Sequence, residues 1–385
     1  MEKKIVHVGQ VSGLSRLSGY GNEQRRVPKV DWLLVCATLL LITIGLMSLF
    51  SEGYSHDGGA NFRKQVVDTL IGVVPFCLFA FTTPLFWRRC VNLIYGLNIA
   101  TLLAVFVIGA HRKGAERWIQ MGPLQFQPSE MAKILTVLTL SAYYANRQSE
   151  IQKPSTFWLG FLHVAVPFLL VLMQPHLGAA LVILVCWAAI SIVAGVPAKY
   201  FAIFAILFLA LGGALALSGK LLHGYQMERV LGIFSHDAKG KSYQTDQAEI
   251  AFGMGGVTGS GFLHGERKAG HFIPEQHDDF IFTVMGEEGG LIGCSLVLVA
   301  YAFFFYRLWL VMFQATDPYY KMIVGGLFAA LSFHTFVNIA MVLHMLPVVG
   351  LWLPFLSYGG TAMWMCMSSV GLALNIRRRE RPLLF

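Results

Sequence analysis

The densest group of titratable side chains lies in the segment IPEQHDDFIFTVMGEEGG, at the start of a long apolar run. One or two acids would suit the positively polarised first turn of a helix, but that does not account for six titratable groups. A carboxylate partly shielded from water can have a raised pKa and act as a general base toward a hydroxyl group. The six residues are Glu275, His277, Asp278, Asp279, Glu287 and Glu288.

The same segment also offers metal ligands. His277 with Asp278 or Asp279 supplies an imidazole nitrogen and carboxylate oxygens, which divalent metal ions accept. The spacing lacks the i,i+4 ligand pair of a helical metal site. General-base chemistry is therefore the preferred interpretation, with Asp278 and Asp279 as secondary metal candidates.

A second candidate group lies in the string QPSEMAK. Pro128 and Ser129 are typical of a helix start, and Glu130 and Lys133, three residues apart, share one helix face. The two charges could form a self-neutralising pair that steadies the helix end. Charges just inside a membrane usually face a cavity or a pathway, so the functional interpretation is preferred.

Arg117 and Trp118 lie side by side in GAERWIQMG, at an expected membrane boundary. A tryptophan there is ordinarily an interfacial anchor. The arginine could also bind a phosphate in a bidentate manner, which lysine does less well. Both interpretations stay open.

Glycines and helix breakers mark two further segments. Residues 252–261 read FGMGGVTGSG, but no strand precedes them and no GK[ST] follows, so they are not a phosphate-binding loop. They indicate flexible backbone or close approach to a ligand. Asn338, Pro347, Pro354 and Ser357 interrupt apolar sequence near the C-terminus, which is tolerated where such residues line a cavity or pack tightly against protein.

These side chains must be positioned by membrane-spanning helices. The chain is 56% hydrophobic and 13% charged, more apolar than a soluble globular protein. Backbone hydrogen bonds in lipid are satisfied within helices, so the fold class is an all-α polytopic integral membrane protein. The net charge of +8 comes from basic clusters beside apolar runs, which argues against nucleic-acid binding. The six cysteines show no CxxC pair.

About ten apolar runs are long enough to cross a bilayer. With ten spans, the short basic loops fall on one side, which predicts that both termini are cytoplasmic. We expect a cytoplasmic tail over 1–30, one transmembrane domain over 31–376 and a cytoplasmic tail over 377–385. A long extracytoplasmic loop, 220–280, would join helices 7 and 8. The runs are 31–51, 65–86, 91–109, 129–146, 157–173, 179–197, 200–219, 281–306, 321–344 and 353–376.

Taken together, the motifs resemble the SEDS family (shape, elongation, division and sporulation), most closely its RodA branch. The resemblance covers nearly the whole chain, in family order and spacing. It rests on ERWI, FQPSEMAK, QPHLG, YQTDQAEIAFGMGGVTGSG, PEQHDDFIFTVMGEEGG, NIAMVLHMLPVVG and LPFLSYGG.

The resemblance implies a peptidoglycan glycosyltransferase that polymerises lipid II, a disaccharide-pentapeptide on undecaprenyl pyrophosphate, at the outer face of the bacterial inner membrane during elongation. It also implies a class B penicillin-binding transpeptidase and other membrane proteins of the elongation complex as partners. The essential acid of the family motif, directly before Phe-Ile-Phe, falls on Asp279. The family's QPSE-x-x-K charges fall on Glu130 and Lys133.

In this chemistry Asp279 would take the proton of the acceptor 4-hydroxyl as it attacks the anomeric carbon. Arg117, Lys133 and Arg229 could stabilise the charge that grows on the pyrophosphate, and a divalent cation, Mg²⁺ or Mn²⁺, could share that role. The expected substrate-binding set is Glu130, Lys133, Arg117, Trp118, Arg229, Glu275, His277 and Ser357.

Three positions depart from the family pattern. The family has Asp in QPDLG, where this chain has His176. The usual HTD is His277-Asp278-Asp279, so a second carboxylate stands beside the proposed base, and adjacent acids can raise each other's pKa. Met254 replaces a polar residue of the glycine segment.

Two other functions remain open. Broken helices and intramembrane charges also describe transporters, here a lipid II flippase. A non-catalytic scaffold for the transpeptidase is the second alternative, and a division-specific FtsW-like polymerase is the alternative branch. The charges gather near one face rather than at the midplane, which favours the polymerase.

Overall fold

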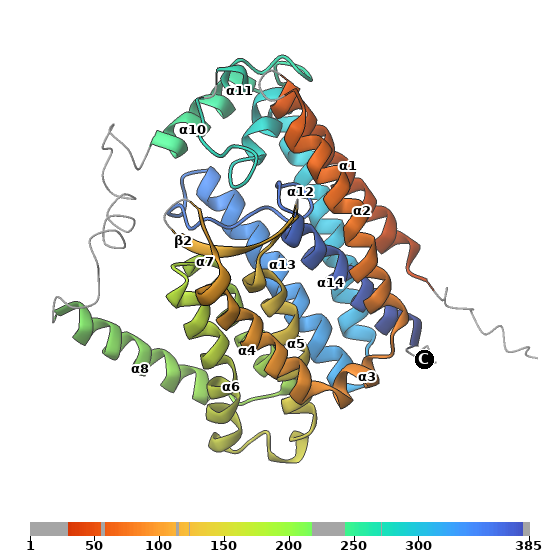
Figure 1. Ribbon diagram of the computed structural model, residues 1–385, viewed down its shortest axis with the longest axis vertical. Coiled ribbons are helices and arrows are strands. Elements are labelled where there is room, and N and C mark those ends of the chain that lie inside the picture. The colour runs from red at the N-terminus through yellow and green to blue at the C-terminus, as the bar shows by residue number, and fades with distance from the viewer. Residues whose placement is uncertain are drawn as a thin grey trace, which may run out of the picture.

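The computed structural model describes residues 30–54, 58–112, 115–122, 124–217, 243–270 and 272–379, and these form a mostly helical bundle (Figure 1). A short 3₁₀ turn covers Gln148–Glu150, and three strands follow α4: β1 (Ala110–Arg112), β2 (Ala115–Met121) and β3 (Leu124–Phe126). The helices are α1 (Trp32–Tyr54), α2 (Ala60–Phe81), α3 (Pro84–Arg89), α4 (Val91–Ile108), α5 (Pro128–Ala145), α6 (Pro154–Met173), α7 (Leu177–Ala194), α8 (Ala198–Leu217), α10 (Tyr243–Gly255), α11 (Glu266–Ala269), α12 (Phe282–Gln314), α13 (Pro318–Val342) and α14 (Gly360–Arg379).

Each of the ten expected spans overlaps one of these helices, although the bounds of several differ by up to eight residues. Seven helices in the described part of the chain are long and apolar enough to cross a membrane by length and composition: α1, α2, α4, α6, α7, α12 and α13. A shorter apolar stretch lies in α8. The remaining two, α5 and α14, are more polar and are mostly buried among other helices, where polar side chains can face protein instead of lipid.

Local sequence fixes where the helices begin. Pro128 stands at the first position of α5, where its missing N–H costs no hydrogen bond. The Asp31 carboxylate accepts from the Leu34 N–H at 3.0 Å at the start of α1. At the start of α13, Asp317 accepts from the Tyr319 N–H at 2.8 Å.

The bundle is built around α5, α7 and α13, which pack against one another, while α14 runs along α2 (Figure 1). Aromatic rings of Phe157, Trp187 and Phe204 join α6, α7 and the first half of α8. Beyond those contacts α8 points away from the other helices (Figure 1). The core that carries the candidate site is therefore the central group of helices.

The bundle has two chemically different ends. At one end, Arg307 of α12 pairs with Asp31 at 2.6 Å, and Arg88 of α3 donates to Asn146, the residue after α5. The last turn of α14 is basic and contains Arg377–Arg379. It lies at the same end of the bundle, because Asn375 of α14 donates to the carbonyl of Phe79 at the end of α2. The candidate site residues lie at the opposite end, with the small sheet and α10.

The sheet is the main element that hydropathy did not reveal. The segment between the apolar runs 91–109 and 129–146 was expected to be a loop, but β1, β2 and β3 pair antiparallel in that order, with Ile119 opposite Phe126. Strands of three to seven residues are too short to show a clear alternation of apolar and polar residues. The hairpin brings Arg117 and Trp118 to the same end of the bundle as the start of α5.

The glycine segment lies against the backbone of α12. A β-carbon on Gly255 would lie 1.9 Å from the Gly286 carbonyl oxygen, and one on Gly259 would lie 2.0 Å from that of Glu288. Within α12, Gly290 has φ of +60° and ψ of −158°, so the helix is kinked there. The sequence suggested flexible backbone or close approach to a ligand, whereas the close approach in the structure is to protein backbone.

Candidate active site

Asp279 lies in the loop before α12 and is held against the segment that joins α13 to α14. Asn338 of α13 donates one N–H to the Asp279 carbonyl at 2.8 Å and the other to the Leu351 carbonyl at 2.7 Å. Oδ2 of Asp279 lies 3.5 Å from where a β-carbon on Gly350 would stand, and Gly350 has φ of +73°. The absence of a side chain at Gly350 leaves room beside the carboxylate.

Glu130 and Lys133 form a fully buried ion pair. The ammonium of Lys133 lies 2.9 and 2.8 Å from the two Glu130 oxygens and 2.8 Å from Nε2 of His334. It also lies 5.2 Å from the centre of the Trp352 ring, on which His334 stacks at 4.1 Å. Lys133 and Asp279 thus lie beside the same connecting segment, at positions two residues apart, Trp352 and Gly350.

Arg117 fastens β2 to the connection between α6 and α7. Its Nε donates to the Gln174 carbonyl at 3.1 Å, and a second guanidinium nitrogen donates to the Pro175 carbonyl. Trp118 is half-buried on β2, opposite Ala110 of β1. Two nitrogen atoms of the Arg117 guanidinium therefore bind backbone carbonyls next to the start of α7 and hold that backbone in place.

His176 stands where the motif resemblance leads us to expect an aspartate. Its Nδ1 lies 3.3 Å from Nε2 of Gln127 and 3.3 Å from Oγ of Ser129. Burial lowers the pKa of His176 well below its usual value, and the nearby charges of Arg117 and Lys133 lower it further. The ring is therefore neutral, and the negative charge of the family's aspartate is not reproduced at this position.

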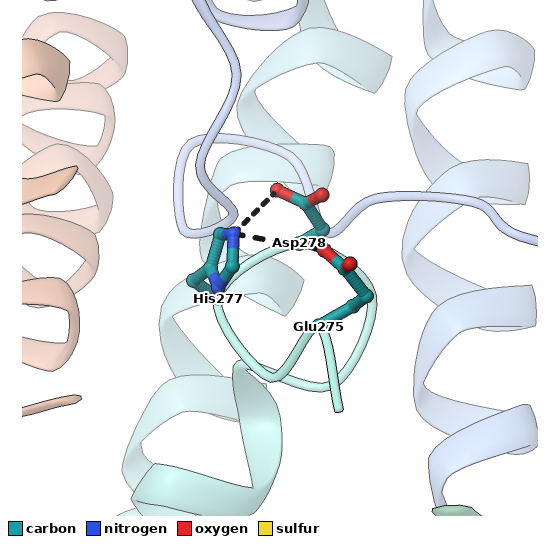
Figure 2. Close-up of side chains that lie close together, drawn as sticks. All are labelled: Glu275, His277 and Asp278. Carbon is teal, nitrogen blue, oxygen red and sulfur yellow. Dashed lines mark ion pairs between the residues drawn. The ribbon is translucent and has the colours of Figure 1, made fainter. Parts of the chain in front are cut away.

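Glu275, His277 and Asp278 come together in one tight loop (Figure 2). Nε2 of His277 lies 3.8 Å from Glu275 Oε2 and 3.7 Å from Asp278 Oδ1. Burial of the ring disfavours its charged form, but the carboxylates of Glu52, Asp278 and Glu275 outweigh burial and raise the pKa of His277. Asp279, the other metal candidate from the sequence, is not one of the three.

Glu52 is a member of this group that the sequence did not single out. It lies in the last turn of α1, is 6% exposed, and places Oε1 3.7 Å from Nδ1 of His277. A single acid near the end of an apolar helix, more than 200 residues from the motif, carries no spacing signal. The one indication was a charge directly after the expected span 31–51.

The acids of the IPEQHDDFIFTVMGEEGG segment divide into two groups. Glu288 is buried, pairs with Lys268, and accepts from the hydroxyl of Ser51 at 2.6 Å. Glu287 is buried and accepts from the Lys268 backbone N–H at 3.2 Å. Through Lys268 and Ser51, these two acids attach the loop before α12 to α12 and to α1. Lys268 therefore has a structural role, which no sequence pattern indicated.

Ser357 shapes the backbone between α13 and α14. Its hydroxyl accepts from the Leu353 N–H at 2.8 Å, and the following N–H of Tyr358 donates to the His277 carbonyl at 2.9 Å. Gln65 of α2 accepts from the Gly359 N–H at 2.9 Å. Ser357 therefore positions the segment that faces Asp279, and Arg229 lies outside the described residues.

The fold belongs to one known class of membrane protein. Residues 29–382 match the family described as "Cell cycle protein", which comprises FtsW, RodA and SpoVE. The chain belongs to this family.

Two curated relatives cover nearly its whole length. The peptidoglycan glycosyltransferase MrdB of Escherichia coli K12 is 33% identical over 354 residues, which is 90% of this chain and 94% of that one. The probable peptidoglycan glycosyltransferase FtsW of Geobacter sp. M18 is 30% identical over 368 residues, covering 93% and 99%.

Solved structures agree with the fold. A chain from the structure titled "Structural coordination of polymerization and crosslinking by a peptidoglycan synthase complex" is 27% identical, has a TM-score of 0.78, and covers 91% of this chain and 98% of its own. The Rod shape determining protein RodA of Thermus thermophilus is 27% identical with a TM-score of 0.68, covering 92% and 98%. The family and fold expected from the motifs are confirmed.

Proposed function

We infer that the protein is a peptidoglycan glycosyltransferase that polymerises lipid II. The observation that carries this is the placement of Asp279 and Lys133 against one connecting segment, at Gly350 and Trp352, in a chain that matches named glycosyltransferases from end to end. A carboxylate and a buried cation held by the same backbone suit a reaction that removes a proton and releases an anion.

The reaction needs one base and one leaving group. Asp279 takes the proton of the acceptor sugar's 4-hydroxyl while that oxygen bonds to the anomeric carbon of the donor. The bond from this carbon to the pyrophosphate oxygen breaks, and undecaprenyl pyrophosphate keeps the electron pair. In-line attack converts an α-linked donor into a β-linked glycan by inversion, with no covalent sugar intermediate.

The growing charge on the pyrophosphate calls for cations. Lys133 is neutralised by Glu130 in the structure, so a pyrophosphate would compete with that carboxylate for the ammonium. Arg117, anchored by two carbonyls, and Arg229 are further candidates, and Trp118, Glu275, His277 and Ser357 complete the proposed substrate-binding set.

We place the site at the outer face of the bacterial inner membrane, with both termini in the cytoplasm. The support is the separation of the two ends of the bundle: Arg88, Arg307 and Arg377–Arg379 lie at one end, and Asp279 lies at the other. Clusters of arginine and lysine mark the cytoplasmic side of membrane proteins.

We also propose a class B penicillin-binding transpeptidase as partner, with other membrane proteins of the elongation complex. The support is the similarity to a chain of a complex whose title joins polymerisation to crosslinking. The RodA-type role in elongation is part of this proposal. Localisation of a fluorescent fusion along the side wall would support it, and localisation at the septum would indicate the FtsW branch.

The test is glycan synthesis from purified lipid II by the full-length protein, alone and with its transpeptidase. Asp279→Asn keeps the size of the side chain but removes the base, so we expect chain synthesis to fall by about 10²- to 10⁴-fold. Asp246→Asn, a carboxylate on α10, is the control and should retain activity. Equal synthesis by wild type and Asp279→Asn would exclude Asp279, and no synthesis by either with the partner present would favour the flippase or the scaffold.

A further inference from the structure

We propose that Glu275, His277 and Asp278 form a binding site for a divalent cation of the Mn²⁺ class, with Glu52 positioning the histidine. The ligand atoms are one carboxylate oxygen each from Glu275 and Asp278 and Nε2 of His277 (Figure 2). The proposal concerns ion binding and does not depend on the proposed glycosyltransferase function.

The three ligand atoms are already close to coordination distance. They all lie within 4.8 Å of one another, and Nε2 lies 3.7 and 3.8 Å from its two carboxylate neighbours. An ion bound at about 2.1–2.4 Å separates neighbouring ligands by roughly 3.0–3.4 Å. The two pairs that include Nε2 need to approach by only a few tenths of an ångström, whereas the two carboxylate oxygens, which lie within 4.8 Å of each other, need a larger side-chain movement. The side chains of Glu275, Asp278 and His277 are 42%, 33% and 24% exposed, which lets water complete the coordination shell.

Glu52 supplies an independent observation that points to an ion. The residue is 6% exposed, and its Oε2 has no hydrogen-bond partner among the described residues. Its other oxygen faces Nδ1 of His277, on the opposite side of the ring from Glu275 and Asp278. A carboxylate that accepts the Nδ1 proton leaves the Nε2 lone pair for a metal, and such pairs commonly support metal-bound histidines.

The backbone and the charges also fit an ion. Glu275 has φ of +55°, and its carbonyl accepts from the N–H groups of Asp278 and Asp279 at 3.1 and 3.3 Å, which closes a tight turn around the three ligands. Two carboxylates carry the charge that one divalent cation neutralises. One imidazole with two carboxylates suits Mn²⁺, which accepts both ligand types.

Asp278 supplies one of the two carboxylates of this site, so ion binding should depend on it. The alternative occupant is a proton on His277, since an imidazolium among three carboxylates is also electrostatically favourable. A metal ion and that proton would occupy the same atom, Nε2 of His277. A measurement of ion binding therefore distinguishes the two.

The experiment uses the full-length protein in detergent, stripped with a chelator and titrated with Mn²⁺. Electron paramagnetic resonance measures the free ion, and pulsed measurements detect a bound nitrogen nucleus. We expect one bound Mn²⁺ with a nitrogen coupling that disappears in His277→Gln. Asp278→Thr and Glu52→Gln should each weaken binding by about 10-fold or more.

The control is Glu150→Gln, which removes an exposed carboxylate paired with Lys153 at the other end of the bundle. It should bind as the wild type does. Binding that is unchanged in Asp278→Thr, or bound Mn²⁺ without nitrogen coupling, would overturn the proposal, and so would no binding by a correctly folded wild type, which would assign Nε2 to a proton.

Asp278 is one-third exposed, so its replacement can be tested even if His277→Gln fails to fold. Glycan synthesis is measured on the same samples. If the wild-type protein synthesises glycan but binds no ion, the cation site is wrong and the proposed function stands. If it binds Mn²⁺ but makes no glycan, the proposed function is wrong and the cation site stands.

Discussion

Lys133 is fully buried, and its ammonium has two kinds of partner: the Glu130 carboxylate and the His334 ring. Attraction between two buried charges roughly offsets the cost of removing them from water, whereas one buried charge left alone is strongly destabilising. The pair can therefore stabilise the fold, serve the substrate, or do both, and these roles respond differently to mutation.

Replacing Lys133 with Met should lower the free energy of unfolding by about 3–5 kcal/mol, because Glu130 then keeps a buried charge without its partner. The double variant Glu130→Gln with Lys133→Met should be more stable than Lys133→Met alone. Thermal unfolding in detergent measures both. If the double variant regains stability but makes no glycan, the charged pair is needed for the reaction. If it regains both stability and glycan synthesis, Lys133 has a structural role only.

His176 offers a test of the family's missing aspartate. Arg117 and Lys133 disfavour a positive charge at this position and favour a negative one, so His176→Asp should unfold within about 1 kcal/mol of the wild type. His176→Lys buries a third cation there and should cost about 3 kcal/mol or more. Thermal unfolding compares the two, and equal stability of both variants would contradict this account.

At the scale of elements, the loop from α10 to α11 is attached to α12 by backbone contact at glycines and by the buried Lys268 and Glu288 pair. Side chains between the two backbones would separate them. The kink of α12 at Gly290 lies where this loop makes its closest approach, since Gly259 N lies 2.4 Å from where a β-carbon on Gly290 would stand.

Two neighbouring glycines of α10 should therefore respond in opposite directions. Gly255→Ala places a methyl group 1.9 Å from the Gly286 carbonyl oxygen and should destabilise by about 1–3 kcal/mol. Gly253→Ala meets nothing within 4 Å inside the same helix and should be neutral or stabilise by up to about 1 kcal/mol. Thermal unfolding distinguishes them, and a destabilised Gly253→Ala would show that the helix face itself is needed.

Sequence patterns could locate the helices but not the contacts between them. A run of apolar residues is continuous, so hydropathy found every span, and Pro128 marked the start of α5. The spacing of Glu130 and Lys133 predicted their ion pair, but the other two partners of Lys133, His334 and Trp352, lie about 200 residues away. No local spacing predicts such pairs, because the packing of α5 against α13 brings them together.

At the scale of the whole molecule, the two ends of the bundle differ in charge and chemistry, and this difference predicts how the protein is oriented. Ser149 lies in the basic end between α5 and α6, and Glu249 lies on α10 near the candidate site. Both side chains are exposed.

We expect Glu249→Cys to react with a membrane-impermeant maleimide in intact spheroplasts, and Ser149→Cys to react only after the membrane is permeabilised. The wild type, with its six native cysteines, gives the background labelling. Labelling of Ser149→Cys from outside, with Glu249→Cys protected, would place Asp279 in the cytoplasm and exclude polymerisation at the outer face.

The candidate site is assembled from segments spread along nearly the entire polypeptide: the end of α1, the start of α5, the loop before α12, the middle of α13, and the stretch leading into α14. During translation these pieces leave the ribosome one after another. Gly350, Trp352 and Ser357 are made almost last, so a nascent chain stalled before them has already inserted most of its helices and yet holds no complete reaction centre. Under the proposed function, we therefore expect newly made protein to be inert until its final helix enters the bilayer.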